Sequence, residues 1–479
     1  MKNRIKQYLL AASMCVGLTA CSDFFEPIPG VQFGLDETFA SKQRTEEYLN
    51  NVYSYVREVT DAIHPNTYGG IFTEASLDGA NRWNKTYAEW TNGSFNSASA
   101  QASEYFSKYY QAIAKASTFI QNVDKCTEAA ASTRGKWKSE ARALRAYYYF
   151  ELLRLYGPIP LIGEDPIPLD ASLEELIKER NSVDECVNFI ATELQSAIDS
   201  GDLLQRAGKA NLGRMDVATC MALKAKLYLY WASPLFNGNT DQASVKNKDG
   251  KQLFPQTEDN SKWAQERDAY ERFMTFATGQ GYKLTEVYTN GKLDPYASCR
   301  AAGEFFTTTW EAVDELIFVK LRDLYDYTYW VCPKFTDFQD TDVTGGGGYY
   351  TTQETVDLFF TKDGLTIEED PGYDKFEGIP SANNFTSGRY YDPNNPSRLY
   401  FDADKSKVLK QWKDREPRFY VNITYSGSIW LNEGKYNEEM RTDFTNGANG
   451  TCGKSKASGD CPDSGYLIRR GAKASNNNG

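Results

Sequence analysis

The stretch from Trp137 to Ile162 constrains the fold of this chain most strongly. Its sequence is WKSEARALRAYYYFELLRLYGPIPLI. Apolar residues recur every three or four positions on one side, and a second apolar set lines the adjoining side, so that charged residues keep only narrow seams. This pattern predicts a central helix that neighbouring helices pack over most of its circumference. Gly157 and Pro158 are expected to end it, because glycine supplies the left-handed turn and proline cannot continue the helical hydrogen bonds.

Other segments of the first half also have helical periodicity. The spacing of Ser182 and Glu185 is that of a capping box, and Ala218, Ala222 and Ala225 form a seam of small residues that lets two helices come close. Successive helices with short links favour an antiparallel stack of the tetratricopeptide type. The predicted helices cover residues 43–60, 103–123, 134–156, 182–200, 215–233 and 261–278.

The second half has a different character. Short apolar pieces such as 315–320 and 420–425 alternate with long connections rich in glycine, aspartate, asparagine and proline, which predicts an irregular lobe with short strands. Loops of this length are uncommon unless they have a function. The glycine run 345–348 is interpreted as a flexible hinge. We therefore expect a mostly α fold, a tetratricopeptide-like helical superhelix with a second, loop-rich lobe.

The N-terminus has the pattern of an export signal. Three basic residues precede a short apolar run from Tyr8 to Leu18, and this run is too short to span a bilayer. Residues 18–21, LTAC, resemble a bacterial lipobox, in which Cys21 receives the lipid; a signal peptide with a coincidental cysteine is the alternative. We expect a signal peptide at 1–20, a lipidated extended leader at 21–42, a helical domain at 43–280 and an irregular ligand-binding lobe at 281–479. Attachment to the membrane through Cys21 alone is the corresponding prediction.

The composition of the chain narrows the classes of ligand that it can bind. The formal charge of −12 argues against nucleic acid or an anionic membrane surface as a partner. The chain has 32 Tyr, 26 Phe and 9 Trp, more aromatic residues than a core requires, and exposed rings suit the flat faces of sugars. A tyrosine-rich helical core is the competing interpretation.

The cysteines carry a weaker signal about the fold. Cys126, Cys186 and Cys220 lie on helical patterns and are interpreted as small buried hydrophobic residues. Cys452 and Cys461 flank a polar loop in which an exported protein could close a disulfide.

The chain offers no strong catalytic motif. His64 is the single histidine, without the partners that a triad or a zinc site needs. The segment 448–455 fits a phosphate-loop pattern but lacks the strand before it and the helix after it. The acidic groups at 337–342 and 368–374 lack the spacing of a calcium loop and are interpreted as solvated. No catalytic residue, cofactor or metal is therefore expected, although 65 acidic residues leave a glycosidase with a carboxylate pair open.

Several blocks, in one order along nearly the whole chain, resemble the SusD/RagB family of outer-membrane nutrient-binding lipoproteins of Bacteroidetes. The family continues beyond the last of these blocks into a further helical section, so we expect this chain to lack its C-terminal part. The blocks are CSDFFEPIP after the lipobox, FTEASLDG at 72–79, the 137–162 helix, 214–238, YTTQETVDLFFTKDG at 350–364, REPRFYVNITYSG at 415–427 and SGYLIRR at 464–470.

The resemblance implies a function and a site. It implies a surface lipoprotein that captures oligosaccharide or polysaccharide, without cleaving it, for a SusC-like TonB-dependent transporter; a surface glycosidase and a peptide-capturing RagB-type protein are the alternatives. It places the family's glycan platform on the segment after the 72–79 block, and the alternating rings before residue 331 form a second aromatic strip. Burial of these rings against the helical lobe is the competing interpretation. The predicted glycan-binding residues are Asn81, Arg82, Trp83, Trp90, Tyr325, Tyr327, Tyr329 and Trp330.

Overall fold

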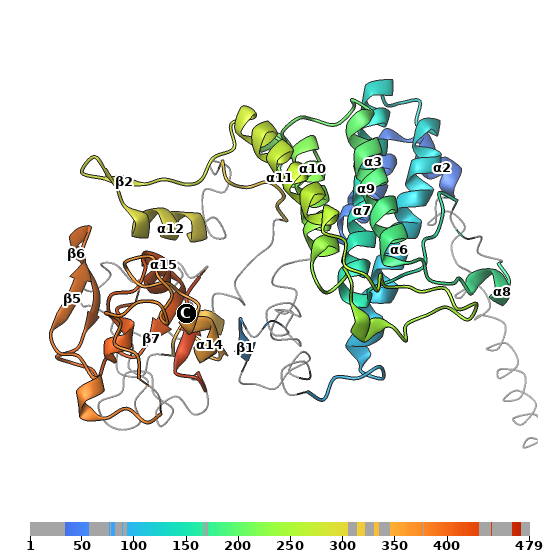
Figure 1. Cartoon of the computed structure of the whole chain (residues 1–479). Coiled ribbons are helices and arrows are strands. Elements are labelled where there is room, and N and C mark those ends of the chain that lie inside the picture. The colour runs from blue at the N-terminus through green and yellow to red at the C-terminus, as the bar shows by residue number, and fades with distance from the viewer. Residues whose placement is uncertain are drawn as a thin grey trace, which may run out of the picture.

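A computed structural model shows a stack of long helices beside a part that contains short helices and strands (Figure 1). This architecture confirms the mostly α, tetratricopeptide-like fold with an irregular second lobe. The residues that the structure describes are 34–56, 76, 78–81, 89, 93–165, 167, 171–304, 314–320, 330–334, 345–376, 378–430, 442 and 462–470.

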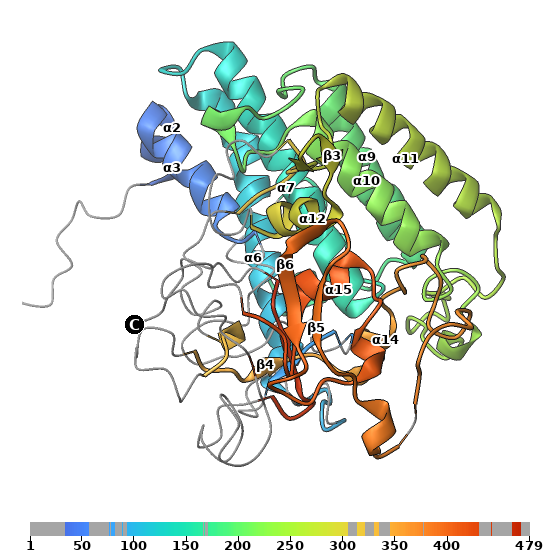
Figure 2. The same ribbon diagram turned by 90° about the vertical axis from the view of Figure 1, so that its left-hand side faces the viewer.

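The long helices pack in chain order. Helix α6 lies against α7, α7 against α9, α9 against α10 and α10 against α11, while α3 contacts α6 and α7; α9, α10 and α11 lie side by side in Figure 2. Among the helices that the structure describes, none has both the length and the apolar character needed to cross a bilayer. The long helices are α3 (Lys42–Tyr53), α6 (Ala100–Asn122), α7 (Ala131–Tyr156), α9 (Val183–Asp199), α10 (Val217–Ala232) and α11 (Ser261–Gly279); the short ones between them are α2 (Leu35–Ala40), η1 (Val123–Lys125), α8 (Leu173–Leu176), η2 (Lys209–Asn211) and η3 (Thr240–Gln242).

The predicted helix ends agree closely with the structure for all of these long helices except α3. The expected capping box opens α9: the Ser182 amide donates to Glu185 Oε2 at 2.7 Å, and the Glu185 amide donates to Ser182 Oγ. The alanine seam also behaves as predicted, because Ala218 packs in a cluster with Phe273 and Ala277 of α11. Local sequence signals therefore locate most of the stack.

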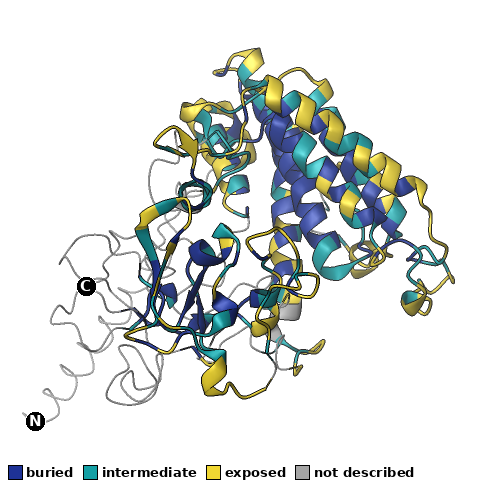
Figure 3. Ribbon diagram, turned by 60° about the vertical axis from the view of Figure 1, so that its left-hand side comes forward, coloured by how far each residue is buried: buried dark blue, intermediate teal, exposed yellow. Residues whose placement is uncertain are grey.

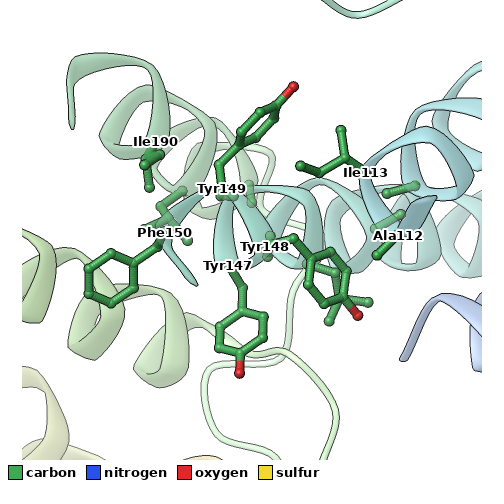
Figure 4. Packing of buried hydrophobic residues seen from close by; sticks show 14 of the residues in the cluster. Ala112, Ile113, Tyr147, Tyr148, Tyr149, Phe150 and Ile190 are labelled. Carbon is green, nitrogen blue, oxygen red and sulfur yellow. The ribbon is translucent and has the colours of Figure 1, made fainter. Parts of the chain in front are cut away.

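Helix α7 is central, as its sequence predicts. Tyr147, Tyr148, Tyr149 and Phe150 are consecutive, so they point in different directions around the helix, and all four are buried (Figure 4). The neighbouring helices show buried inner faces and exposed outer faces (Figure 3). Gly157 ends α7 at φ +68°, and its amide donates to the Leu153 carbonyl at 3.0 Å. Burying four aromatic side chains on one helix contributes roughly 1.5–3 kcal/mol for each side chain.

The narrow charged seams of α7 contain residues that are buried. Glu140, Arg145 and Glu151 are each 3% exposed or less. Arg145 Nε donates to Glu193 Oε2 at 2.9 Å, while Glu140 Oε2 accepts from Arg214 at 3.0 Å and from the Tyr53 hydroxyl at 2.9 Å. Burial raises the pKa of Glu140, and the nearby Arg214 opposes this shift. Ion pairs with Glu193 of α9 and with Arg214, in the turn before α10, replace water here, because a buried charge needs a partner.

Two predictions near the N-terminus are corrected. The leader 21–42 is not extended throughout, because α2 forms within it and buries Phe39 completely. Helix α3 ends at Tyr53 and not at residue 60. The Ser54 hydroxyl donates to the Asn51 carbonyl at 2.7 Å, and a turn follows. A serine that bonds its own preceding turn competes with continued helix.

The second part is built from short elements around its own aromatic core. Tyr400 stacks on Tyr420 with ring centroids 4.0 Å apart, and Trp412 and Tyr425 are also buried there. Its elements are α12 (Pro295–Glu304), α14 (Gln353–Asp357), η5 (Ala382–Asn384), η6 (Lys410–Trp412) and α15 (Pro417–Asn422); the hairpins β2 (Tyr288–Thr289) with β3 (Lys292–Leu293) and β5 (Arg389–Asp392) with β6 (Asn395–Asp402); and a sheet of β1 (Ala80–Asn81), β4 (Tyr349–Tyr350), β8 (Tyr466–Ile468) and β7 (Ile423–Tyr425).

Two apolar pieces of this part differ from the expected strands. Residues 315–320 form turns and bends over the helical stack, where Phe318 meets Tyr147 edge to face at 6.0 Å. In the piece 420–425, the first three residues end α15 and only the last three form β7. Pro417 at the first helical position favours the helix there. Tertiary packing decides both cases, because short apolar runs are ambiguous in sequence.

Asp294 gives an acid-dependent prediction for this part. Its buried carboxylate joins both terminal nitrogens of Arg398 at 3.0 Å, and Arg398 also pairs with Asp392 at 2.6 Å. The hydrogen bond from Arg398 is the largest cause that lowers the pKa of Asp294 below its usual value. Because the folded pKa is depressed, this stabilisation is complete above the unfolded pKa of about 4 and is lost as the pH falls through the folded pKa.

We therefore expect Asp294→Asn to lose about 2 kcal/mol at pH 7 and less at pH 3. Urea unfolding of both proteins at the two pH values measures this difference. A difference that stays constant with pH would contradict the assigned role of Asp294.

Candidate ligand site at the four-stranded sheet

The four-stranded sheet brings together segments that are far apart in the chain. Its order is β1-β4-β8-β7, and all of its pairs are antiparallel. In the β1–β4 pair, Ala80 faces Tyr350 and Asn81 faces Tyr349. The Thr351 hydroxyl fixes this pair further by donating to the Asp78 carbonyl at 2.7 Å. Asn81, the first of the predicted glycan-binding residues, is therefore held against β4.

The glycine run before β4 is a packed connection. Gly345–Gly348 are buried, and the amides of Gly345 and Gly347 donate to the carbonyls of Pro333 (3.2 Å) and Cys332 (2.9 Å). A Cβ added at Gly345 would lie 2.0 Å from the Cys332 carbonyl oxygen. Glycine is needed here for close backbone approach, so the interpretation of this run as a flexible hinge is wrong.

These contacts bring the described ends of the two predicted ligand segments, Asn81 and Trp330, to one junction. Asn81 pairs with Tyr349, Tyr349 lies two residues after Gly347, and Gly347 bonds to Cys332, which lies two residues after Trp330. We refer to the segments 78–81, 330–334 and 345–351 as the sheet junction. Loops carried on a rigid scaffold are the usual place for ligand contacts.

Trp330 lies where the two parts of the molecule meet. Its side chain is half-buried and packs against the core of the helical stack. Burial against the helical lobe, the competing interpretation from the sequence, thus accounts for part of its surface. The remaining surface can still contact a ligand, because a tryptophan presents a large face even when it is anchored on one side.

The remaining sequence-predicted residues lie outside the described part of the chain, apart from the backbone of Asn81 in β1. Those that lie outside are Cys21, Arg82, Trp83, Trp90, Tyr325, Tyr327, Tyr329, Cys452 and Cys461, together with His64 and residues 337–342 and 448–455.

Strands β8 and β7 complete the sheet on the side of β4 that is away from β1. Tyr466 of β8 donates its hydroxyl to Gln353 Oε1 at 2.7 Å and accepts from Trp412 Nε1 at 3.0 Å. Burial raises the pKa of Tyr466 to about 12, so the phenol stays neutral and keeps donating at physiological pH. A fully bonded aromatic support of this kind holds the sheet rigid.

The acidic segment 368–374 forms local bonds. Glu368 pairs with Lys375 at 3.1 Å, Asp374 pairs with Lys410 at 3.5 Å, and Asp370 accepts from the Gly372 amide at 2.8 Å. Within the described residues, no group of three or more histidine, cysteine, aspartate or glutamate side chains is arranged to hold a metal ion. Cys126, Cys186 and Cys220 are buried and unbridged, as predicted.

Sequence reasoning missed the strand that organises the junction. Tyr349 and Tyr350 follow four glycines and precede two threonines, and a short run of aromatic and β-branched residues is a strand signal. The partner of β4 lies more than 250 residues earlier in the chain, at β1. Nothing local to either segment encodes that pairing, so the signal could locate a strand but not the junction.

Comparison with known proteins identifies the family. A model described as the SusD family matches residues 315–479, and a model described as "Starch-binding associating with outer membrane" matches residues 32–229. The chain belongs to the SusD/RagB family. A SusD-like protein of Bacteroides ovatus is 27% identical over 175 residues, which are 35% of this chain and 30% of that relative. The match thus spans less than a third of the curated relative.

Solved structures share the fold. The structure named BT4246 matches with a TM-score of 0.72 and 23% identity, covering 90% of this chain and 72% of that one. A SusD-like protein of Bacteroides fragilis, BF3747, matches with a TM-score of 0.61 and 20% identity, covering 92% of this chain and 71% of that one. At this identity the likeness concerns the fold.

Proposed function

We propose that this protein is a cell-surface lipoprotein that captures oligosaccharides or polysaccharides without cleaving them. The family description names starch binding and association with the outer membrane, and the high aromatic content suits sugar faces. The captured glycan would pass to a TonB-dependent outer-membrane transporter, which co-purification of the two proteins from outer membranes would test. If no such transporter co-purifies with this protein, the proposed transfer of the glycan to it is wrong.

The observation that carries the proposal is the sheet junction. It draws the strand that precedes Arg82 and Trp83 close to the segment that contains Trp330. A tryptophan at this junction can stack on a sugar ring, and we propose that Asn81, at the end of β1, and Arg82, directly after it in the sequence, bond the sugar hydroxyls. The proposed glycan-binding set remains Asn81, Arg82, Trp83, Trp90, Tyr325, Tyr327, Tyr329 and Trp330.

The proposed anchor is the lipid on Cys21, at the end of the predicted signal peptide. Two or more acyl chains on one residue would hold the protein stably at a membrane. Wild type should partition into detergent and Cys21→Ala should not; equal partitioning of both would exclude this anchor.

Alanine substitution of the tryptophans tests the site. We expect Trp83→Ala and Trp330→Ala each to weaken glycan binding by about thirtyfold, equivalent to about 2 kcal/mol, because each removes a stacking face. Affinity electrophoresis in gels with and without polysaccharide measures the change. Trp263, an exposed tryptophan on α11, provides the control, and Trp263→Ala should bind like wild type. Unchanged affinity in both site variants would mean that the glycan binds elsewhere.

A further inference from the structure

A small pocket lies on the helical stack, away from the sheet junction. It is formed between α9, α10 and α11 and has a volume of about 260 Å³. Ile198, Met221 and Ala269 are its apolar lining residues. Pockets that take drug-sized ligands begin at roughly 300 Å³, so this one suits a single sugar residue. The polar lining consists of Gln195, Lys224, Tyr228, Gln265, Asp268 and Arg272.

The two cations of this pocket are not neutralised. Lys224 is half-buried, and its ammonium donates to Gln195 Oε1 at 2.8 Å. Neither Lys224 nor Arg272 forms an ion pair with a carboxylate of the residues that the structure describes. Lys262 of α11, by contrast, lies 3.0 Å from the carboxylate of Asp184.

The carboxylates near the pocket are already engaged. Asp268 accepts from Arg267 at 2.9 Å. Asp199 accepts from Gln195 Nε2 at 2.7 Å, and its charge raises the pKa of Lys224 without forming an ion pair with it. Burial lowers the pKa of Lys224, and the positive charge of Arg272 lowers it further. A bound anion would reduce this repulsion and give the half-buried Lys224 a counter-charge.

We propose that this pocket binds the anionic group of an acidic sugar residue, either the carboxylate of a uronic acid or a sulfate ester. Lys224 and Arg272 would pair with the anion, the Tyr228 ring would contact the sugar face, and Gln195 and Gln265 would bond hydroxyls. This inference rests on the proposed glycan-binding function and adds acidic glycans to its ligands. It concerns a site independent of Trp83 and Trp330.

Matched probes test the charge requirement. Calorimetric titrations of the mature protein would use a galacturonic acid trimer and its fully methyl-esterified form, which share a backbone and differ in charge; a sulfated and an unsulfated galactose trimer form the second pair. The wild type should bind one of the two acidic trimers more tightly than its neutral counterpart. Tighter binding of the galacturonic acid trimer identifies the anion as a carboxylate, and tighter binding of the sulfated trimer identifies it as a sulfate ester.

Lys224→Met or Arg272→Met should weaken binding of the acidic trimer by about tenfold and leave binding of the neutral one unchanged, because each removes one charged hydrogen-bond donor. Lys226→Met is the matched control, since it makes the same charge change at an exposed position of α10. Arg272 is exposed, so its variant preserves the test if Lys224→Met does not fold.

The outcomes separate this inference from the proposed function. Equal affinity for the acidic trimer in wild type and both pocket variants overturns it, as does an equal loss in Lys226→Met, which would indicate nonspecific charge attraction. Neutral glycan binding that depends on Trp330 would still stand in either case. If no sugar binds but inorganic sulfate stabilises wild type and not Lys224→Met, the pocket is an anion site without sugar specificity and the assignment to acidic sugars is wrong.

Discussion

Glu193→Met is expected to destabilise the helical stack by about 3–5 kcal/mol. Glu193 is the buried carboxylate that pairs with Arg145, which is completely buried, and with Arg142 at 2.9 Å. Its removal leaves the Arg145 guanidinium with the Ser117 hydroxyl at 3.1 Å and the exposed carboxylate of Glu164 at 3.9 Å. Neither replaces a buried counter-charge, and an uncompensated buried charge is among the most destabilising changes in a core.

Urea unfolding followed by circular dichroism measures this loss. Arg145→Met should cost less, because Arg142 still partners Glu193, and the double variant should recover part of the loss, since no buried charge then remains unpaired. Glu271→Met on the exposed face of α11 should change stability by less than about 1 kcal/mol. A single Glu193 variant as stable as wild type would show that this ion pair does not hold α7 to α9.

Gly345→Ala is the second large effect that we expect. The added methyl group would lie 2.0 Å from the Cys332 carbonyl oxygen, whereas the change causes no backbone strain of its own because Gly345 is not among the positive-φ glycines. The two segments must therefore move apart, at a cost of about 1–3 kcal/mol. The displacement also moves Trp330 relative to β1, so glycan affinity should fall together with stability.

Differential scanning calorimetry and the glycan titration measure the two consequences of Gly345→Ala. Gly208 is an exposed glycine with open space around it, and Gly208→Ala should leave both quantities near their wild-type values. Full glycan affinity in Gly345→Ala would show that the ligand site does not depend on the sheet junction.

The helical stack could be predicted because its signals are local. Apolar spacing located α7, and Ser182 with Glu185 located the start of α9. The burial of Glu140 and Arg145 could not be predicted, because their partners, Arg214 in the turn before α10 and Glu193 of α9, are distant in the sequence. A charged residue within a helical pattern is usually solvated, and only tertiary contacts reverse that expectation.

The sheet junction was beyond local reasoning for the same reason. A two-residue strand such as β1 leaves almost no periodicity, and its pairing with Tyr349 and Tyr350 is set by the fold. The family resemblance nevertheless indicated the segment after residue 79, and the alternation of rings indicated the segment that ends at Trp330. The pocket at Lys224 left no motif, since its groups come from three helices and meet only when those helices pack.

The most direct test of the proposed function is a panel of neutral polysaccharides with two readouts on the same mature protein. Affinity electrophoresis measures retention, and chromatography of the incubated glycan measures any released sugar. We predict that at least one polysaccharide retards the protein and that none is shortened. Release of oligosaccharides, or mobility unchanged by every glycan of the panel, would contradict the proposal that this protein captures sugar chains without cleaving them.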